Sequence, residues 1–174
     1  MFLNRIAPAV AAIALMSAVT LAQGAKPTDP QIAHIAYTAG VLDITAAQQA
    51  LKKTQNAEVR GFAEGMIKDH ETVNKLALDL VAKLKVTPED NPTAQSLKTG
   101  GEKNVANLKT LSGAAFDKAY IDHEVEYHQA VLDAVDKTLI PSAKNAELKA
   151  LLQKGLKIFQ GHEKHAESVV AKLK

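Results

Sequence analysis

Small and apolar residues recur every three or four positions along most of the chain, which is the spacing of one helix face. No segment alternates apolar and polar residues over the length of a β-strand. The pattern therefore predicts an all-α fold. The five helices that it predicts cover residues 30–54, 57–85, 92–111, 114–139 and 145–173.

Helix start signals support these boundaries. A polar side chain that can accept a hydrogen bond from a first helical turn stands near the start of each segment, and several are followed by proline. The segment 92–111 has the weakest helical pattern, because it is the most polar and contains Gly100 and Gly101. The capping residues expected from the sequence are Asp29, Asn56, Thr87, Asn91, Ser112 and either Ser142 or Asn145.

The segment 92–111 also decides how the helices are arranged. At 1.5 Å per residue it is about 30 Å long, which is enough to return the chain along the whole molecule. The helices at 57–85 and 114–139 would then run parallel, as in ferritin-like bundles with one long crossover connection. We therefore expect a ferritin-like four-helix bundle with an additional crossover helix.

The N-terminal residues have the features of a secretory signal peptide. Arg5 precedes an apolar run from Ile6 to Ala22. A transmembrane anchor would need a longer apolar stretch with interfacial flanks. We assign residues 1–25 to a cleaved signal peptide and residues 26–174 to a single helical-bundle domain with no stable transmembrane anchor after processing. The expected location is periplasmic or secreted.

Composition narrows the classes of function. The chain has no cysteine, so neither a disulfide framework nor a cysteine-linked lipid anchor is expected. Its 21 basic and 19 acidic residues are interleaved without a basic block, which disfavours nucleic acid as a partner. Hydrolase and nucleotide-binding functions have no support, because no nucleophile triad or glycine-rich phosphate loop is recognisable.

Four ionisable residues lie at the centres of apolar helix faces: Asp43, His70, His128 and His162. Burying a carboxylate costs several kcal/mol unless it is paired, so Asp43 requires a partner. Parallel helices would place His70 and His128 level with Asp43. His162 is expected about 10 Å farther along the bundle, at the edge of the cluster, because it lies farther from Pro141 than His128 does.

Two interpretations of this cluster remain open. The four residues either form a buried hydrogen-bond network that fixes helix register, or they bind a divalent transition metal such as zinc, copper, nickel or iron. A ferritin-type di-iron centre is disfavoured, because the chain contains no Glu-x-x-His motif.

Three classes of function follow from these interpretations. The first choice is a periplasmic, non-enzymatic bundle protein that binds such a metal. The alternatives are a metal-dependent enzyme that uses the same cluster and a purely structural or interaction module of the cell envelope. The partner expected is an envelope protein or a second copy of the chain.

Residues 58–74 read Glu-Val-Arg-Gly-Phe-Ala-Glu-Gly-Met-Ile-Lys-Asp-His-Glu-Thr-Val-Asn. This segment, the Phe-Asp-Lys-Ala-Tyr run at 116–120 with His128, and His162 with Ala166 resemble an exported bacterial family, domain of unknown function 4142. The resemblance extends from about residue 30 to the end and implies a ferritin-like helical fold, often with a periplasmic or outer-membrane location. Relatives usually carry glutamate where this chain has Asp43. The family has no established activity, so the resemblance leaves the function open.

The signal-peptide assignment predicts that the exported protein begins between residues 23 and 26. The small residues Thr20, Ala22 and Gly24 suit the positions before a cleavage site. Intact mass spectrometry of protein from a periplasmic fraction measures the start directly. Retention of Met1 in a membrane fraction would contradict the assignment.

Overall fold

The computed structural model describes residues 26–173, and every regular element in that part of the chain is a helix. The expected all-α class is therefore confirmed for these residues, and the predicted signal peptide at 1–25 lies outside them. A π-helical turn and a three-residue helix continue the fourth long helix without a break. The elements are α1 (Asp29–Lys53), α2 (Ala57–Leu84), α3 (Pro92–Thr110), α4 (Gly113–Ala134), the π-turn η1 (Val135–Leu139), α5 (Ile140–Ser142) and α6 (Ala146–Lys172).

Three of the expected capping residues cap a helix. The side chains of Asn56, Asn91 and Asn145 accept hydrogen bonds from backbone N–H groups in the first turns of α2, α3 and α6. Ser112 precedes α4, but its side chain makes no such bond. The asparagine caps fix the starts of three helices and so fix the phase of their buried faces.

Two start signals were wrong. The cap of α1 is Thr28 rather than Asp29, whose carboxylate instead accepts hydrogen bonds from the backbone N–H groups of Lys144 and Asn145 at 2.8 and 2.9 Å. Asp29 therefore joins the start of α1 to the turn before α6. Thr87 does not begin a helix, because the segment around it is irregular. A hydrogen bond from the backbone N–H of Glu89 to the carbonyl of Pro30 holds this segment against α1.

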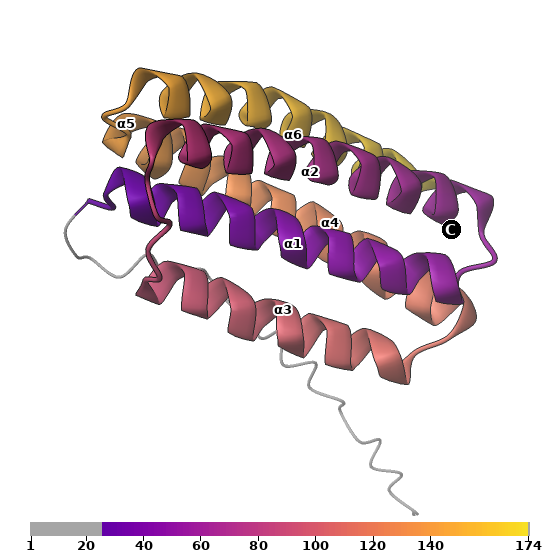
Figure 1. Ribbon diagram of the computed structural model, residues 1–174. Coiled ribbons are helices and arrows are strands. Elements are labelled where there is room, and N and C mark those ends of the chain that lie inside the picture. Colours follow the sequence, from indigo (N-terminus) through magenta and orange to yellow (C-terminus); the bar gives the residue numbers. More distant parts are fainter. Residues whose placement is uncertain (1–25, 174) are drawn as a thin grey trace, which may run out of the picture.

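Figure 1 shows α1, α2, α4 and α6 side by side, with α3 lying along α1. Helix α6 packs against both α2 and α4, and α1 packs mainly against α2 and α3. Helices α2 and α4 run in the same direction, because α3 carries the chain back along the molecule. This arrangement brings four helices, and the side chains at their centres, around one interior.

Glycines allow α1 to approach two other helices closely. A Cβ atom at Gly40 would overlap the side-chain amide of Asn74 in α2. A Cβ atom at Gly101 of α3 would overlap the side chain of Leu42 in α1. The second contact explains a glycine inside the helix whose pattern was weakest. Its neighbour Gly100 faces open space and has no such role.

Buried apolar residues form two separate cores. One contains Phe62 and Phe116 and lies toward the loop between α1 and α2, while the other contains Leu139 and Leu152 and lies toward the turn before α6. Buried ionisable side chains occupy the sequence positions between the two cores on α1, α2, α4 and α6. We call this set the polar layer. Its members are Asp43, His70, Glu124, His128 and His162.

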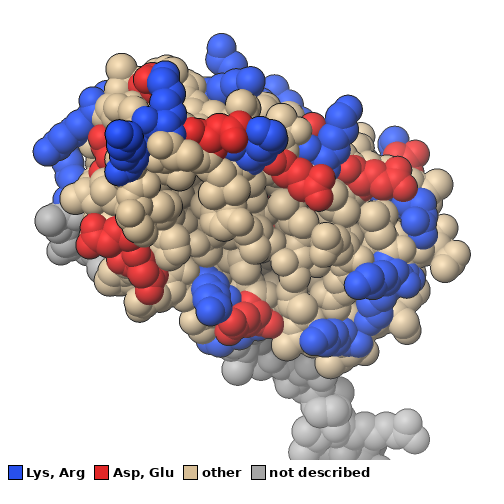
Figure 2. Space-filling view, in the orientation of Figure 1, with Lys and Arg blue, Asp and Glu red and all other residues tan. Residues whose placement is uncertain are grey.

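The exposed surface carries charges of both signs. On the face shown in Figure 2, lysine and arginine side chains are interspersed with aspartate and glutamate. Pairs one helical turn apart, such as Lys75 with Asp79 at 2.7 Å, are exposed and contribute about 0.3–0.5 kcal/mol each. None of the helices in the described part of the chain is both long and apolar enough to cross a membrane.

The close contact at Gly40 predicts opposite effects of alanine at two glycines. Gly40→Ala should lower the free energy of unfolding by about 1–3 kcal/mol, because the added methyl group overpacks the contact with Asn74. Gly100→Ala should raise it by about 0.5–1 kcal/mol, because it only restricts the unfolded chain. Urea unfolding measures both, and equal stabilisation by the two substitutions would contradict the packing described.

Candidate functional site

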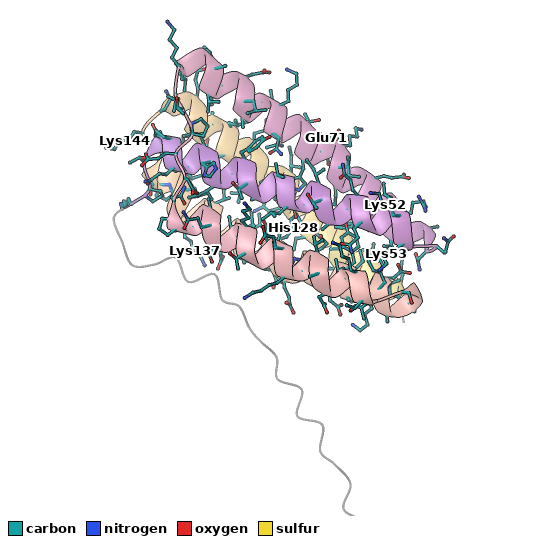
Figure 3. The ribbon with its side chains drawn as sticks, turned by 60° about the horizontal axis from the view of Figure 1, so that its bottom comes forward. Lys52, Lys53, Glu71, His128, Lys137 and Lys144 are labelled. Carbon is teal, nitrogen blue, oxygen red and sulfur yellow. The ribbon has the colours of Figure 1, made fainter. Side chains whose placement is uncertain are left out.

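Four helices contribute to the polar layer. Helices α1, α2 and α6 each supply one side chain, and α4 supplies two that are one turn apart. The exposed fractions are 7% for His162 and 4% or less for the other four residues, so none of these groups is hydrated as it would be on the surface. In Figure 3, His128 lies in the interior between the helices, whereas Lys52 and Lys137 lie on the outside.

His162 lies closer to the cluster than its sequence position predicted. The helical backbone continues through η1 and α5 past Pro141, so the turn before α6 is confined to residues 143–145. His128 is therefore 14 residues before Ser142, and His162 is 16 residues after Ala146. A difference of two residues is about 3 Å of helix rise instead of the expected 10 Å. His162 therefore belongs to the cluster. It differs from the other members only in having the largest exposed fraction.

The ring of His128 is oriented by its own helix. Its Nδ1 lies 2.8 Å from the carbonyl oxygen of Glu124, one turn earlier. Since a carbonyl oxygen only accepts, Nδ1 must carry the hydrogen and donate it. In the neutral ring Nε2 then has a free lone pair, and it is buried without a hydrogen-bond partner among the described residues.

The ring of His162 is oriented from a different helix. Its Nε2 lies 3.0 Å from Oδ2 of Asp69 in α2, whose side chain is 44% exposed. Nε2–H donates to this carboxylate, so the neutral ring has its lone pair on Nδ1. Within residues 26–173, that atom is also buried without a hydrogen-bond partner. Asp69 therefore fixes the orientation of the His162 ring, although its own side chain is partly exposed.

The third imidazole lies between an aromatic ring and a carboxylate. Nε2 of His70 is 3.4 Å from Oδ2 of Asp43, a close contact that lacks hydrogen-bond alignment. One face of the ring stacks on Phe159, with centroids 5.0 Å apart and planes 7° from parallel. Nδ1 of His70 has no hydrogen-bond partner in the described part of the chain. The predicted pairing of Asp43 with an imidazole is therefore present.

The polar layer contains two overlapping groups of metal-ligand atoms. His70, His128 and His162 each bring one ring nitrogen within 4.8 Å of the others. Asp43, Glu124 and His128 likewise bring one ligand atom each within 4.8 Å of one another. All four residues singled out in the sequence are thus brought together, and Glu124 is an addition to them.

Glu124 is not among the four residues that the sequence singled out. It lies one turn before His128 in α4. In the structure its side chain is 1% exposed. Burial, and then the nearby Asp43, raise the pKa of Glu124 well above its usual value, and burial does the same to the pKa of Asp43. The sequence signal that could have identified Glu124 as part of the cluster was its spacing of one helical turn from His128.

The same burial keeps the imidazoles neutral. It lowers the pKa of His128 to about 4. The pKa of His70 falls well below its usual value through burial and the positive charge that His162 and His128 would carry. Burial also lowers the pKa of His162, although the hydrogen bond to Asp69 acts in the opposite direction. At neutral pH the three rings are unprotonated, which is the form that binds metal ions.

A family model described as Domain of unknown function (DUF4142) matches residues 14–169. The chain belongs to the DUF4142 family. The resemblance seen in residues 58–74 and in the later histidine segments is thereby confirmed, and the whole polar layer falls within the part that matches DUF4142. No curated protein and no solved structure matches the chain. The chemistry of this DUF4142 protein therefore has to be argued from the geometry of its own residues.

The raised pKa of Glu124 predicts a pH-dependent effect of Glu124→Gln. In the unfolded chain the carboxyl ionises above about pH 4.5, but in the folded chain it stays protonated to higher pH. Between the unfolded and the folded pKa, the free energy of unfolding falls by about 1.4 kcal/mol per pH unit, because the unfolded chain loses this proton first. The contribution of the neutral carboxyl is therefore fully present at low pH and is lost as pH rises.

Glu124→Gln removes this loss, so the variant should gain stability relative to the wild type as pH rises from 4.5 to 7. Denaturant unfolding across this range, with a chelator present, measures the difference. A constant difference at every pH would show that Glu124 is ionised in the folded protein.

Proposed function

We propose that this protein binds one divalent transition-metal ion through His70, His128 and His162. The observation that carries the proposal is the orientation of the rings. In His128 and His162 one ring nitrogen donates to a carbonyl or a carboxylate, and in His70 one nitrogen lies 3.4 Å from the carboxylate of Asp43; the other nitrogen of each ring is buried without a partner among the described residues. Metal-binding histidines have this arrangement, because the outer contact fixes the ring and makes the free nitrogen a better ligand.

The separation of the nitrogens supports the same conclusion. Three ligands at about 2.0–2.1 Å from a tetrahedral zinc ion are about 3.4 Å from one another. One nitrogen of each ring lies within 4.8 Å of one nitrogen of each of the other two rings, so a change of about 1 Å in the ring positions would complete the site. Neutral imidazole ligands suit zinc, copper, nickel and iron.

The surrounding charges favour a cation. Asp43 contacts His70 and Asp69 accepts from His162, so two carboxylates lie immediately outside the three rings. A dication bound to neutral ligands would gain from both charges, and its presence would favour ionisation of Asp43. In this proposal Asp43 orients His70 and balances the charge of the metal ion, and it is not a direct ligand. The proposed ligands are therefore three of the four residues that the sequence suggested.

A closed hydrogen-bond network that only fixes helix register accounts less well for these contacts. In such a network the free nitrogens would bond to one another or to the buried carboxyl groups. Instead, Nε2 of His128 and Nδ1 of His162 have no partner, and neither has Oε2 of Glu124. Leaving a buried polar group without a partner costs about 1–3 kcal/mol. A ligand that satisfies several of these atoms at once removes that cost.

The proposal includes export and a ferritin-like fold. The signal-peptide features at residues 1–25 support delivery to the periplasm or secretion. The parallel course of α2 and α4, with α3 between them in sequence, supports a ferritin-like bundle with one crossover helix. In this setting the protein acts as a metal-binding component of the cell envelope without a catalytic reaction.

The test is metal binding by a matched pair of histidine variants. Wild-type protein freed of metal with a chelator is titrated calorimetrically with Zn²⁺ and Ni²⁺. His162→Ala should weaken binding by about a hundredfold or more, because it removes a ligand. His165→Ala should bind as the wild type does, because that ring lies one turn farther along α6 and is exposed. Asp69→Asn should weaken binding by about 10–100-fold.

Other outcomes decide against this site. Binding that is lost in Glu124→Gln but retained in His162→Ala would place the ion on the group formed by Asp43, Glu124 and His128. If the wild type binds neither ion, and His162→Ala changes only the free energy of unfolding, the polar layer is a structural network. Circular dichroism of each variant confirms that it is folded before the titration is interpreted.

A further inference from the structure

A cavity of about 80 Å³ lies beside the polar layer, on the side of the apolar core that contains Leu152. Side chains from α1, α2, α4 and α6 form most of its wall, and α3 closes one part of it. His70 and Phe159, the stacked pair of the polar layer, also line it. The cavity therefore adjoins the imidazole whose Nδ1 has no partner.

Small side chains create this space. Six alanines and two glycines line the cavity, and at one of these glycines, Gly40, a Cβ atom would overlap Asn74. Larger residues at these positions would fill an interior that is otherwise closely packed. The remaining wall consists mainly of branched apolar side chains such as Val73, Val131 and Leu152.

The chemistry of the wall selects an apolar occupant. A buried water requires two to four hydrogen-bonding partners, whereas cavities lined by aliphatic and aromatic groups hold apolar molecules. The few polar residues in the wall are His70 and Asn74 from α2, Thr93 from α3 and Tyr127 from α4. All other residues of the wall are apolar or glycine.

The volume limits the size of that occupant. A cavity of about 150 Å³ lined by similar residues accepts benzene or xenon. The cavity here has about half of that volume, at about 80 Å³. It therefore fits a molecule of a few heavy atoms and excludes an aromatic ring.

We propose that this cavity is a binding site for a small uncharged apolar molecule, smaller than benzene, held against the His70–Phe159 pair. The class includes diatomic gases and hydrocarbons of two to four carbons. The site depends on the shape and chemistry of the wall and does not require the proposed metal ion. When both are occupied, the apolar molecule lies next to the metal-binding imidazoles.

Xenon is the probe for this site. Wild-type protein is titrated with dissolved xenon while the NMR signals of the His70 and Phe159 rings are followed, first without metal and then with Zn²⁺. The expected result is saturable binding that shifts both signals and leaves the exposed ring of His165 unchanged. Crystals pressurised with xenon should show the atom between α1, α2, α4 and α6.

Two alanine variants of the same helix provide the control. Ala77→Leu fills the cavity from α2 and should abolish saturable xenon binding. Ala82→Leu adds the same side chain at an exposed position of α2 and should leave binding unchanged. In a third variant, Leu152→Ala enlarges the cavity and should create measurable benzene binding that the wild type lacks.

The proposal is overturned if wild-type protein shows no saturable xenon binding. It is also overturned if Ala77→Leu, shown to be folded, binds xenon as the wild type does, or if the wild type binds benzene as tightly as Leu152→Ala does. The pressurised wild-type crystal decides the question if Ala77→Leu does not fold. Because the first titration is done without metal, failure of the metal site would leave the xenon result unaffected.

Discussion

The structure depends on placing five ionisable side chains in one buried layer. Asp43, Glu124 and three histidines are each less than a tenth exposed. In that setting a charged form is stable only beside an opposite charge, so the groups either stay neutral or act together on a ligand. Removal of water is the largest cause of the raised carboxyl pKa values and of the lowered imidazole pKa values, and neighbouring groups of like charge add to the shifts of Glu124 and His70. The apolar cores above and below the layer keep the water out.

This layer also constrains the packing of the helices. Four helices must meet with their central residues at the same level, and none can slide without separating a carboxylate from an imidazole. The asparagine caps set the starting points of α2 and α6, and the contact of Gly40 with Asn74 sets the distance between α1 and α2. The small side chains that permit this close approach also leave the cavity beside His70. The same small residues therefore allow the helices to pack closely and leave part of the interior unfilled.

The fold was largely predictable from the sequence, because helix periodicity and capping are local properties. Asp43, His70 and His128 were found because each stands at the centre of an apolar stripe, which identifies a buried polar group without any knowledge of its partners. The true level of His162 was not predictable, since it depends on whether the chain remains helical past Pro141. Glu124 and Asp69 were ambiguous for a related reason. Their roles depend on contacts between side chains of facing or successive turns, and hydrophobic pattern alone does not determine those contacts.

The position of His128 has a chemical consequence for any metal bound in this layer. His128 belongs to both groups of ligand atoms, yet its Nδ1 donates to the Glu124 carbonyl, which leaves one lone pair for coordination. One lone pair binds one cation. A single ion in this layer would therefore use one group or the other, the nitrogen-rich one or the oxygen-rich one. Softer ions that prefer imidazole and harder ions that prefer carboxylate would compete for the same residue, His128.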